Sequence, residues 1–259
     1  MSALTFDQIR KAKEEGGIWR TIHGSPVFIQ EGESLNEALT RRFGTKGKEG
    51  TVEFTLLSKD KVDAYMKQYS RAVYEKKGFS KDQLDTVNNY TGLYYAHING
   101  YLDGSWKPGD DTIVGLDFSK QQVEEQVAAL DKFTSQKIPE DMLVYRGMEL
   151  SSSQLKRLKQ TVDAGKEATL KHKGFVSTSM AKAGRGMGGM EYRNPVELAI
   201  RIEVPKGTRG GIVGNGLSRM KGDREVLLAR NTSITITRID YHKDEWGTPK
   251  ATIWAQVKR

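Results

Sequence analysis

The chain has 259 residues, of which 37% are hydrophobic and 29% are charged, a composition typical of a globular protein with a sizeable core. Its 41 lysines and arginines against 33 aspartates and glutamates give a formal net charge of +8, and it contains no cysteine. The composition therefore excludes disulfides, cysteine nucleophiles and cysteine-ligated zinc, and no apolar run is long enough for a transmembrane helix.

The excess positive charge fits a nucleic-acid partner or an acidic protein surface. Because no dense block of lysine and arginine occurs, an ordinary solvated surface is the favoured explanation of the charge. The four histidines lack the spacing of metal ligands, and the N-terminus lacks the apolar segment of a secretory signal. The sequence thus predicts no metal site and no membrane association.

Residues 1–45 are predicted to form an N-terminal extension. Residues 19–29 indicate two short extended pieces around a turn at Gly24–Pro26. The polar, glycine-punctuated stretch Phe43–Gly50 is typical of a linker. The main domain is therefore expected over residues 50–259.

The first half of this main domain has helical periodicity. Apolar residues recur at helical spacing over 62–77, and the next helix is predicted to begin at a capping box, Ser80–Gln83. Further helices are predicted over 90–102, with a break near Gly92, and over 118–133.

The second half changes to strand patterns. The predicted strands are 142–146, 168–173, 175–179, 196–204, 225–229, 233–239 and 251–257. The glycine-rich stretch 210–222 is predicted to be a mobile loop. Because helices precede strands instead of alternating with them, the order predicts an α+β fold.

Two segments of the β-rich half carry side chains suited to binding. Arg146 ends a predicted strand and is followed by Gly147, an arrangement that presents a fork of donors matched to phosphate. Ser177, Thr178 and Ser179 follow one another on a strand, so the two serines share one face and the threonine lies on the other. Such hydroxyls can orient a carboxylate or a ligand.

A third segment pairs two carboxylates. Asp223 and Glu225 lie two apart at the start of a predicted strand, which places both on one face, directly after the glycine-rich stretch. Taken singly, each of the three segments also fits an ordinary exposed arginine or strand end. Their combination and order carry the argument.

The order of Arg146, Ser177–Ser179 and Glu225 resembles the mono-ADP-ribosyltransferase exoenzymes of the Arg–Ser–Glu group. The similarity extends to further segments and covers roughly residues 50–259; these segments are 89–102, 195–208 and 225–232. The resemblance implies an ADP-ribosyltransferase-like α+β fold with two packed β-sheets and flanking N-terminal helices.

The resemblance also implies a reaction, the transfer of ADP-ribose from NAD to a macromolecular acceptor with release of nicotinamide and without a metal. Glu225 would stabilise the positive charge that develops as the glycosidic C–N bond breaks, and Ser177 would hold Glu225 in place. Arg146 would bind the pyrophosphate or adenosine end of NAD. The remaining residues implied to bind NAD are Gly147, Thr178, Ser179, Asn99 and Arg193.

Asp223 departs from the family pattern, which usually has Glu or Gln at this acceptor-facing position. A carboxylate there implies a protein arginine as the acceptor. Three alternatives stay open: an NAD glycohydrolase, because the shorter carboxylate favours water; a nucleic-acid acceptor, which the positive charge would help to bind; and a catalytically silent NAD-binding virion module.

Residues 19–29 also resemble a segment at the ends of some phage head-morphogenesis proteins, which sometimes carry fused ADP-ribosyltransferase domains. This similarity implies a phage protein or toxin that acts in the cytoplasm of a bacterium, its own or a target, and that is carried in a phage particle. An antitoxin or immunity protein would then be a further partner. A simple β-hairpin packed on the domain explains the same stretch.

Overall fold

The chain divides into two compact units, Met1–Gly50 and Thr51–Arg259. The computed structural model describes residues 17–22, 25–30, 59–110, 118–148, 152–180, 197–219, 224–243 and 249–258. In the first unit, β1 (Gly17–Ile22) and β2 (Ser25–Gln30) pair as an antiparallel hairpin, which confirms the two extended pieces predicted from the sequence. The predicted linker Phe43–Gly50 lies outside the described residues.

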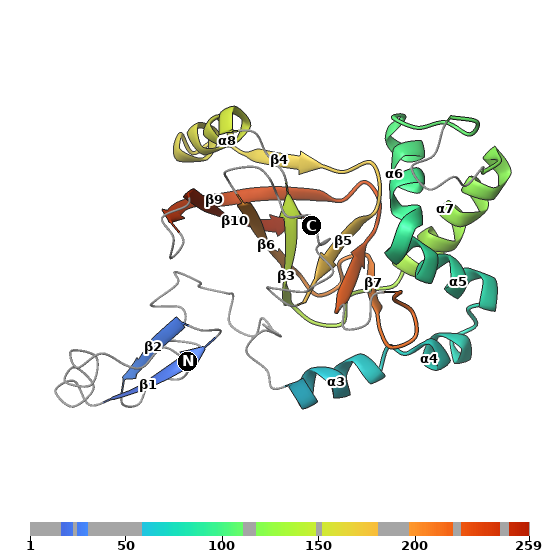
Figure 1. Ribbon diagram of the computed structural model, residues 1–259, viewed down its shortest axis with the longest axis horizontal. Helices are drawn as coiled ribbons and strands as arrows, with labels where there is room; N and C mark the ends of the chain where they lie inside the picture. The colour runs from blue at the N-terminus through green and yellow to red at the C-terminus, as the bar shows by residue number, and fades with distance from the viewer. Residues whose placement is uncertain are drawn as a thin grey trace. The chain divides into compact units, whose positions relative to one another are not determined.

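The second unit contains a mixed sheet of eight strands in the order β4-β9-β10-β6-β3-β5-β8-β7 (Figure 1). Strands β6 and β10 run parallel, and the other neighbouring pairs are antiparallel. The strands are β3 (Met142–Met148), β4 (Ala168–Lys171), β5 (Val176–Ser179), β6 (Glu197–Val204), β7 (Gly210–Val213), β8 (Glu225–Leu228), β9 (Ser233–Lys243) and β10 (Pro249–Val257).

The sheet narrows between β3 and β5, where the register consists of the pair Tyr145 and Ser179. We call this point the junction; it divides the sheet into a larger half, β4-β9-β10-β6-β3, and a smaller half, β5-β8-β7. Side chains alternate between the two faces of a strand. On β8, Val226 and Leu228 belong to an apolar cluster shared with the larger half, whereas Leu227 belongs to a cluster shared with the helices.

The two halves therefore pack face to face, and the helices cover the outer face of the smaller half. This arrangement confirms the predicted α+β fold, with the difference that backbone hydrogen bonds join the two β-layers into one sheet.

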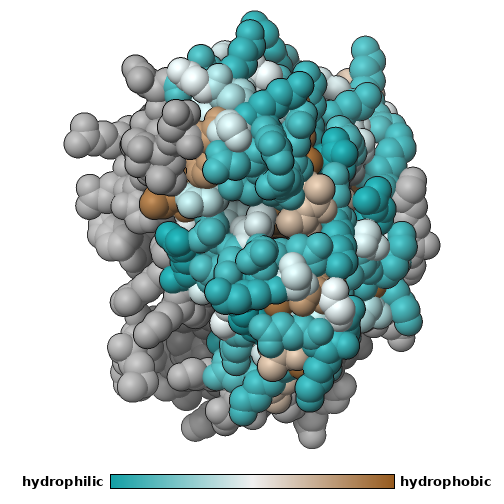
Figure 2. Space-filling model, turned by 90° about the vertical axis from the view of Figure 1, so that its right-hand side faces the viewer, coloured by the Kyte–Doolittle hydropathy of each residue, from teal (hydrophilic) through white to brown (hydrophobic). Residues whose placement is uncertain are grey.

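Helices α4 to α7 gather beside β5 and β7, while α8 lies near β4 (Figure 1). The surface on the helical side is mainly hydrophilic (Figure 2), as expected for amphipathic helices that bury one apolar face. The helices are α3 (Lys59–Lys67), α4 (Arg71–Lys76), α5 (Lys81–Asn89), the π-helical turn η2 (Tyr90–Tyr94), α6 (Tyr95–Asp103), α7 (Lys120–Thr134) and α8 (Ser152–Asp163). Among the helices described, none has the length and apolar character needed to cross a membrane.

Local signals explain where these helices begin and end. The predicted capping box is present, since Ser80 Oγ accepts from the backbone N–H of Gln83 and the Gln83 side chain accepts in return. The single helix predicted over 62–77 is wrong, because Ser70 has an extended backbone and begins the separate helix α4. The break predicted near Gly92 is confirmed as the π-helical turn.

Strand β7 corrects the prediction of a loop over 210–222. Its first two residues, Gly210 and Gly211, have low β-propensity, yet the strand is buried throughout. A side chain on Gly211 would collide with the ring of Phe133 on α7, and one on Gly210 would come within 3.0 Å of the Leu227 carbonyl oxygen. The glycines thus allow helix α7 and strand β8 to approach β7 closely.

Candidate active site

Glu225 begins β8 and is only 7% exposed. Its neighbours in the register are Ser179 on β5 and Val213 on β7, and Ser179 in turn lies opposite Tyr145 on β3. This row of residues crosses the junction between the two halves of the sheet. The structure therefore places the predicted carboxylate one strand away from the point where the sheet divides.

Arg146 bridges the same junction. Its Nη1 atom donates a hydrogen bond of 3.0 Å to the carbonyl oxygen of Ser177, which links the end of β3 to β5. Arg146 and Gly147 are both partly exposed, so a ligand can reach this part of the junction. The arginine, the serine strand and Glu225 are thus brought together as the sequence predicts.

The hydroxyls of β5 divide between the two faces of the strand. Ser177 and Ser179 are partly exposed, whereas Thr178 is 3% exposed and donates a 2.7 Å hydrogen bond to the carbonyl oxygen of Val226. The predicted alternation is therefore confirmed. The hydroxyl directly opposite Glu225 is that of Ser179, while Ser177 lies two residues further along the same face.

Asn99 fixes the start of β5 to helix α6. Its amide nitrogen donates to the Phe175 carbonyl oxygen at 3.2 Å and to the Tyr90 hydroxyl at 3.0 Å, and its oxygen accepts from the Phe175 N–H at 2.9 Å. Gly174 has no side chain because a Cβ there would collide with the Asn99 amide. Asn99 thereby sets the position of the strand that carries the serines.

Replacing Asn99 with alanine is expected to lower the free energy of unfolding by about 1–3 kcal/mol, because it leaves the Phe175 N–H without its partner and weakens the hold on Tyr90. Denaturant unfolding measures this change. Asn88→Ala on α5, where no side-chain hydrogen bond of Asn88 is found within the described residues, serves as the control. Equal losses for the two variants would contradict the anchoring role.

Tyr90 is a member of this cluster to which the sequence assigns no role. Its hydroxyl donates a 3.2 Å hydrogen bond to the Phe175 carbonyl oxygen. Burial raises the pKa of Tyr90 well above its usual value; the charge of Glu225 adds to this, while hydrogen bonds from Asn99 and Ser177 and the charge of Arg146 oppose it. The phenol therefore stays protonated and keeps donating to the Phe175 carbonyl oxygen, close to Arg146, Ser177 and Glu225.

His172, in the connection between β4 and β5, is a second residue to which the sequence assigns no role. Burial, with a smaller contribution from the positive charge of Arg146, lowers the pKa of the His172 imidazole. The ring is therefore neutral at pH 7, and its buried Nε2 atom has no hydrogen-bond partner in the part of the chain that the structure describes.

Two predicted site residues, Asp223 and Arg193, lie outside the described residues. The described neighbour of Asp223 is Arg224, whose carbonyl oxygen accepts a 2.7 Å hydrogen bond from the Met180 N–H. The residues that the structure describes hold no cluster of His, Asp and Glu side chains suited to a metal ion.

A polar pocket of about 1090 Å³ lies elsewhere, at the other end of β8 from Glu225. It is lined by the turns 206–209 and 230–233, with Lys137 and Lys258. Since its lining includes neither Arg146 nor the serine strand, it is separate from the candidate active site.

The comparisons with known proteins point to one family. The family model described as ADP-ribosyltransferase exoenzyme matches residues 58–257. No curated protein sequence matches the chain.

Solved structures with the same fold are ADP-ribosylating enzymes. Plx2a, an ADP-ribosyltransferase toxin from Paenibacillus larvae, is 22% identical with a TM-score of 0.59, covering 81% of this chain and all of that one. The Clostridium limosum C3 exoenzyme is 24% identical with a TM-score of 0.54, covering 84% of this chain and all of that one. C3stau2 from S. aureus, solved with NAD, is 21% identical with a TM-score of 0.53, covering 76% of this chain and 95% of that one.

These structural similarities establish the fold, and the family model, which matches well over half of the chain, establishes the family. The substrate of such enzymes is NAD. The chain therefore belongs to the ADP-ribosyltransferase exoenzyme family and is an NAD-dependent mono-ADP-ribosyltransferase.

Proposed function

We propose that the chain transfers ADP-ribose to arginine side chains of a protein, with Glu225 as the carboxylate that stabilises the reacting ribose. The observation that most directly supports the role of Glu225 is its burial beside the junction, which the hydrogen bond from Arg146 to Ser177 bridges. A negative charge removed from water interacts more strongly with charge that develops nearby.

The proposed chemistry begins with the glycosidic bond of NAD. The C–N bond to nicotinamide breaks, the electron pair leaves with nicotinamide, and the ribose carbon becomes positively charged, as in glycoside hydrolysis. Glu225 stabilises that charge. The acceptor nitrogen then bonds to the ribose carbon and loses one proton, for which Asp223 is the proposed base.

The residues around the junction fit the parts of NAD. The Arg146 guanidinium offers planar donors for the pyrophosphate or adenosine end, and the Gly147 backbone is the proposed contact for the nicotinamide amide. Ser177 and Ser179 present hydroxyls on the face of Glu225 for the ribose.

Three further residues contribute to NAD binding, directly or through strand β5. Thr178 and Asn99 contribute by holding β5, since their side chains already bond Val226 and Phe175. Arg193 is proposed to contact phosphate or nicotinamide.

The identity of the acceptor rests on Asp223. Asp223→Ala is expected to reduce transfer to the acceptor more than it reduces hydrolysis of NAD. The carboxylate orients a guanidinium acceptor, whereas water can attack without it. Transfer is measured as label from NAD fixed to protein, and hydrolysis as free ADP-ribose. Equal losses of both would count against an acceptor-side role for this residue.

Incubating the protein with labelled NAD and a bacterial lysate tests the function as a whole. Label that protease removes and nuclease does not would support a protein acceptor, and its chemical lability would identify arginine. Label that nuclease removes would identify a nucleic acid, instead of a protein arginine, as the acceptor. Transfer that falls steeply as the salt concentration rises would also favour a nucleic-acid acceptor. Free ADP-ribose alone would indicate a glycohydrolase.

A further inference from the structure

The connection between β7 and β8 begins and ends beside the proposed catalytic carboxylate. Val213, the last residue of β7, is the register partner of Glu225, the first residue of β8. The chain therefore leaves this position after Val213 and returns to it at Glu225. Residues 214–219, the described first part of the connection, are here called the anchored segment.

The anchored segment is fastened to the helical layer at several points. Leu217 is fully buried in the cluster shared with the helices. The backbone N–H of Arg71 donates a 3.0 Å hydrogen bond to the carbonyl oxygen of Asn215. A side chain on Gly214 would collide with the carbonyl of Tyr69, so only glycine allows this approach.

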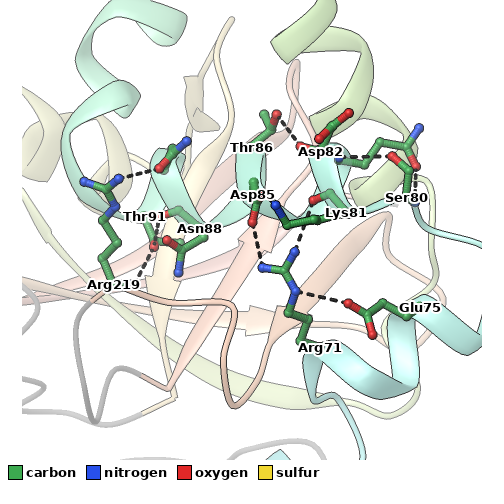
Figure 3. Close-up of polar contacts among 12 residues, drawn as sticks. Arg71, Glu75, Ser80, Lys81, Asp82, Asp85, Thr86, Asn88, Thr91 and Arg219 are labelled. Atoms are coloured by element: carbon green, nitrogen blue, oxygen red, sulfur yellow. Dashed lines mark hydrogen bonds and ion pairs between the residues drawn. The ribbon is translucent and has the colours of Figure 1, made fainter.

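Arg219 makes the last of these attachments (Figure 3). Its backbone N–H donates to Thr91 Oγ1 at 3.1 Å, and its Nη2 atom donates to Asn89 Oδ1 at 2.6 Å. Its side chain passes over Gly92, where an added Cβ would lie 2.7 Å from Arg219 Cδ. Arg219 thus ties the anchored segment to the point where α5 continues into the π-helical turn.

The groups proposed to act on NAD are held by other contacts. Tyr90 and Asn99 are bonded to Phe175, Arg146 is bonded to Ser177, and Glu225 is paired with strands on both sides. None of these contacts involves Arg219. Its removal should therefore leave the cleavage of NAD largely intact.

We propose that Arg219 is a positioning residue that sets how ADP-ribose divides between the acceptor and water. This inference rests on the proposed function. The anchored segment that Arg219 fastens continues directly from Val213, the register partner of Glu225, so it forms part of the surface over which a bulky acceptor approaches the ribose. Water can attack without such a surface, whereas a misplacement of the acceptor by about 1 Å can lower the rate of transfer on the order of 10²-fold.

Arg219→Ala is the first test. We expect the ratio of protein-bound label to free ADP-ribose to fall at least about tenfold, with nicotinamide release in the absence of acceptor within about twofold of wild type. Arg230→Ala is the matched control, because Arg230 is an exposed arginine paired with Asp131 at 2.8 Å at the other end of β8. This control should leave the ratio unchanged.

Gly92→Ala is the second test and separates positioning from stability. Alanine has a higher helix propensity than glycine, so the midpoint of thermal unfolding should stay the same or rise. The new Cβ nevertheless displaces the Arg219 side chain, so the transfer ratio should fall as in Arg219→Ala. The double variant should match Arg219→Ala alone, because both changes act on one contact.

The outcomes separate the inference from the function on which it rests. An unchanged ratio in both variants, with nicotinamide release still dependent on Glu225, would overturn the role of Arg219 and leave the proposed function standing. Equal losses of transfer and hydrolysis, with a lower unfolding midpoint, would make Arg219 a structural residue and also overturn the inference. Failure of the wild-type protein to release nicotinamide would overturn both.

Discussion

Replacing Glu225 with glutamine is expected to lower nicotinamide release and ADP-ribose transfer by at least about 10²–10³-fold. The substitution keeps the shape of the side chain, so the register with Ser179 and Val213 should persist. It removes the negative charge, and a neutral amide cannot stabilise the developing charge on the ribose to the same extent. The measurements are nicotinamide released from NAD and the thermal unfolding midpoint.

Glu167→Gln is the matched control for this experiment. Glu167 is an exposed carboxylate paired with Lys258 at 2.8 Å, and it belongs to none of the contacts around the junction. It should retain wild-type turnover. Near-normal turnover of Glu225→Gln would contradict the assignment of the carboxylate.

Replacing Arg146 with lysine is expected to raise the KM for NAD on the order of 10²-fold, an effect of roughly 3 kcal/mol. Arginine can bond the Ser177 carbonyl oxygen through one nitrogen and still present others to a phosphate. Lysine has one nitrogen on a flexible chain, so it cannot keep both contacts in fixed geometry. Steady-state kinetics over a range of NAD concentrations measures the change.

Arg157→Lys is the control, because Arg157 is an exposed arginine on α8. Its KM for NAD should equal that of the wild type. If Arg146→Lys also left the KM unchanged and lowered only stability, Arg146 would act as a link between β3 and β5 and not as an NAD ligand.

Local sequence signals predict much of the fold. The capping box at Ser80–Gln83, the strand over 233–239 and the two faces of Ser177–Ser179 each depend on neighbouring residues alone, and each is confirmed. Strand β7 escapes such prediction because its first two residues are glycines. They are present for contacts with Phe133 and Leu227, which come from elsewhere in the chain.

In the candidate site, too, some residues can be identified from the sequence and others cannot. Arg146, Ser177 and Glu225 are identified by their order along the chain, and the structure brings them together. Tyr90 is missed because it lies nine residues before Asn99, a spacing that places two residues about 180° apart on a regular α-helix. The π-helical turn that begins at Tyr90 changes this phase. Gly92 signals a break in the sequence, but the periodicity of the sequence does not show the change of phase.

The junction has a consequence for how this enzyme tolerates substitutions. Arg146 belongs to one β-layer and Glu225 to the other, and the two layers share the apolar cluster that contains Val226 and Leu228. A volume change in that cluster can shift one layer against the other without disturbing the interior of either. Across a library of conservative core variants, the turnover number should therefore change in variants whose free energy of unfolding stays close to that of the wild type. The reason is that turnover depends on the alignment of two separate layers.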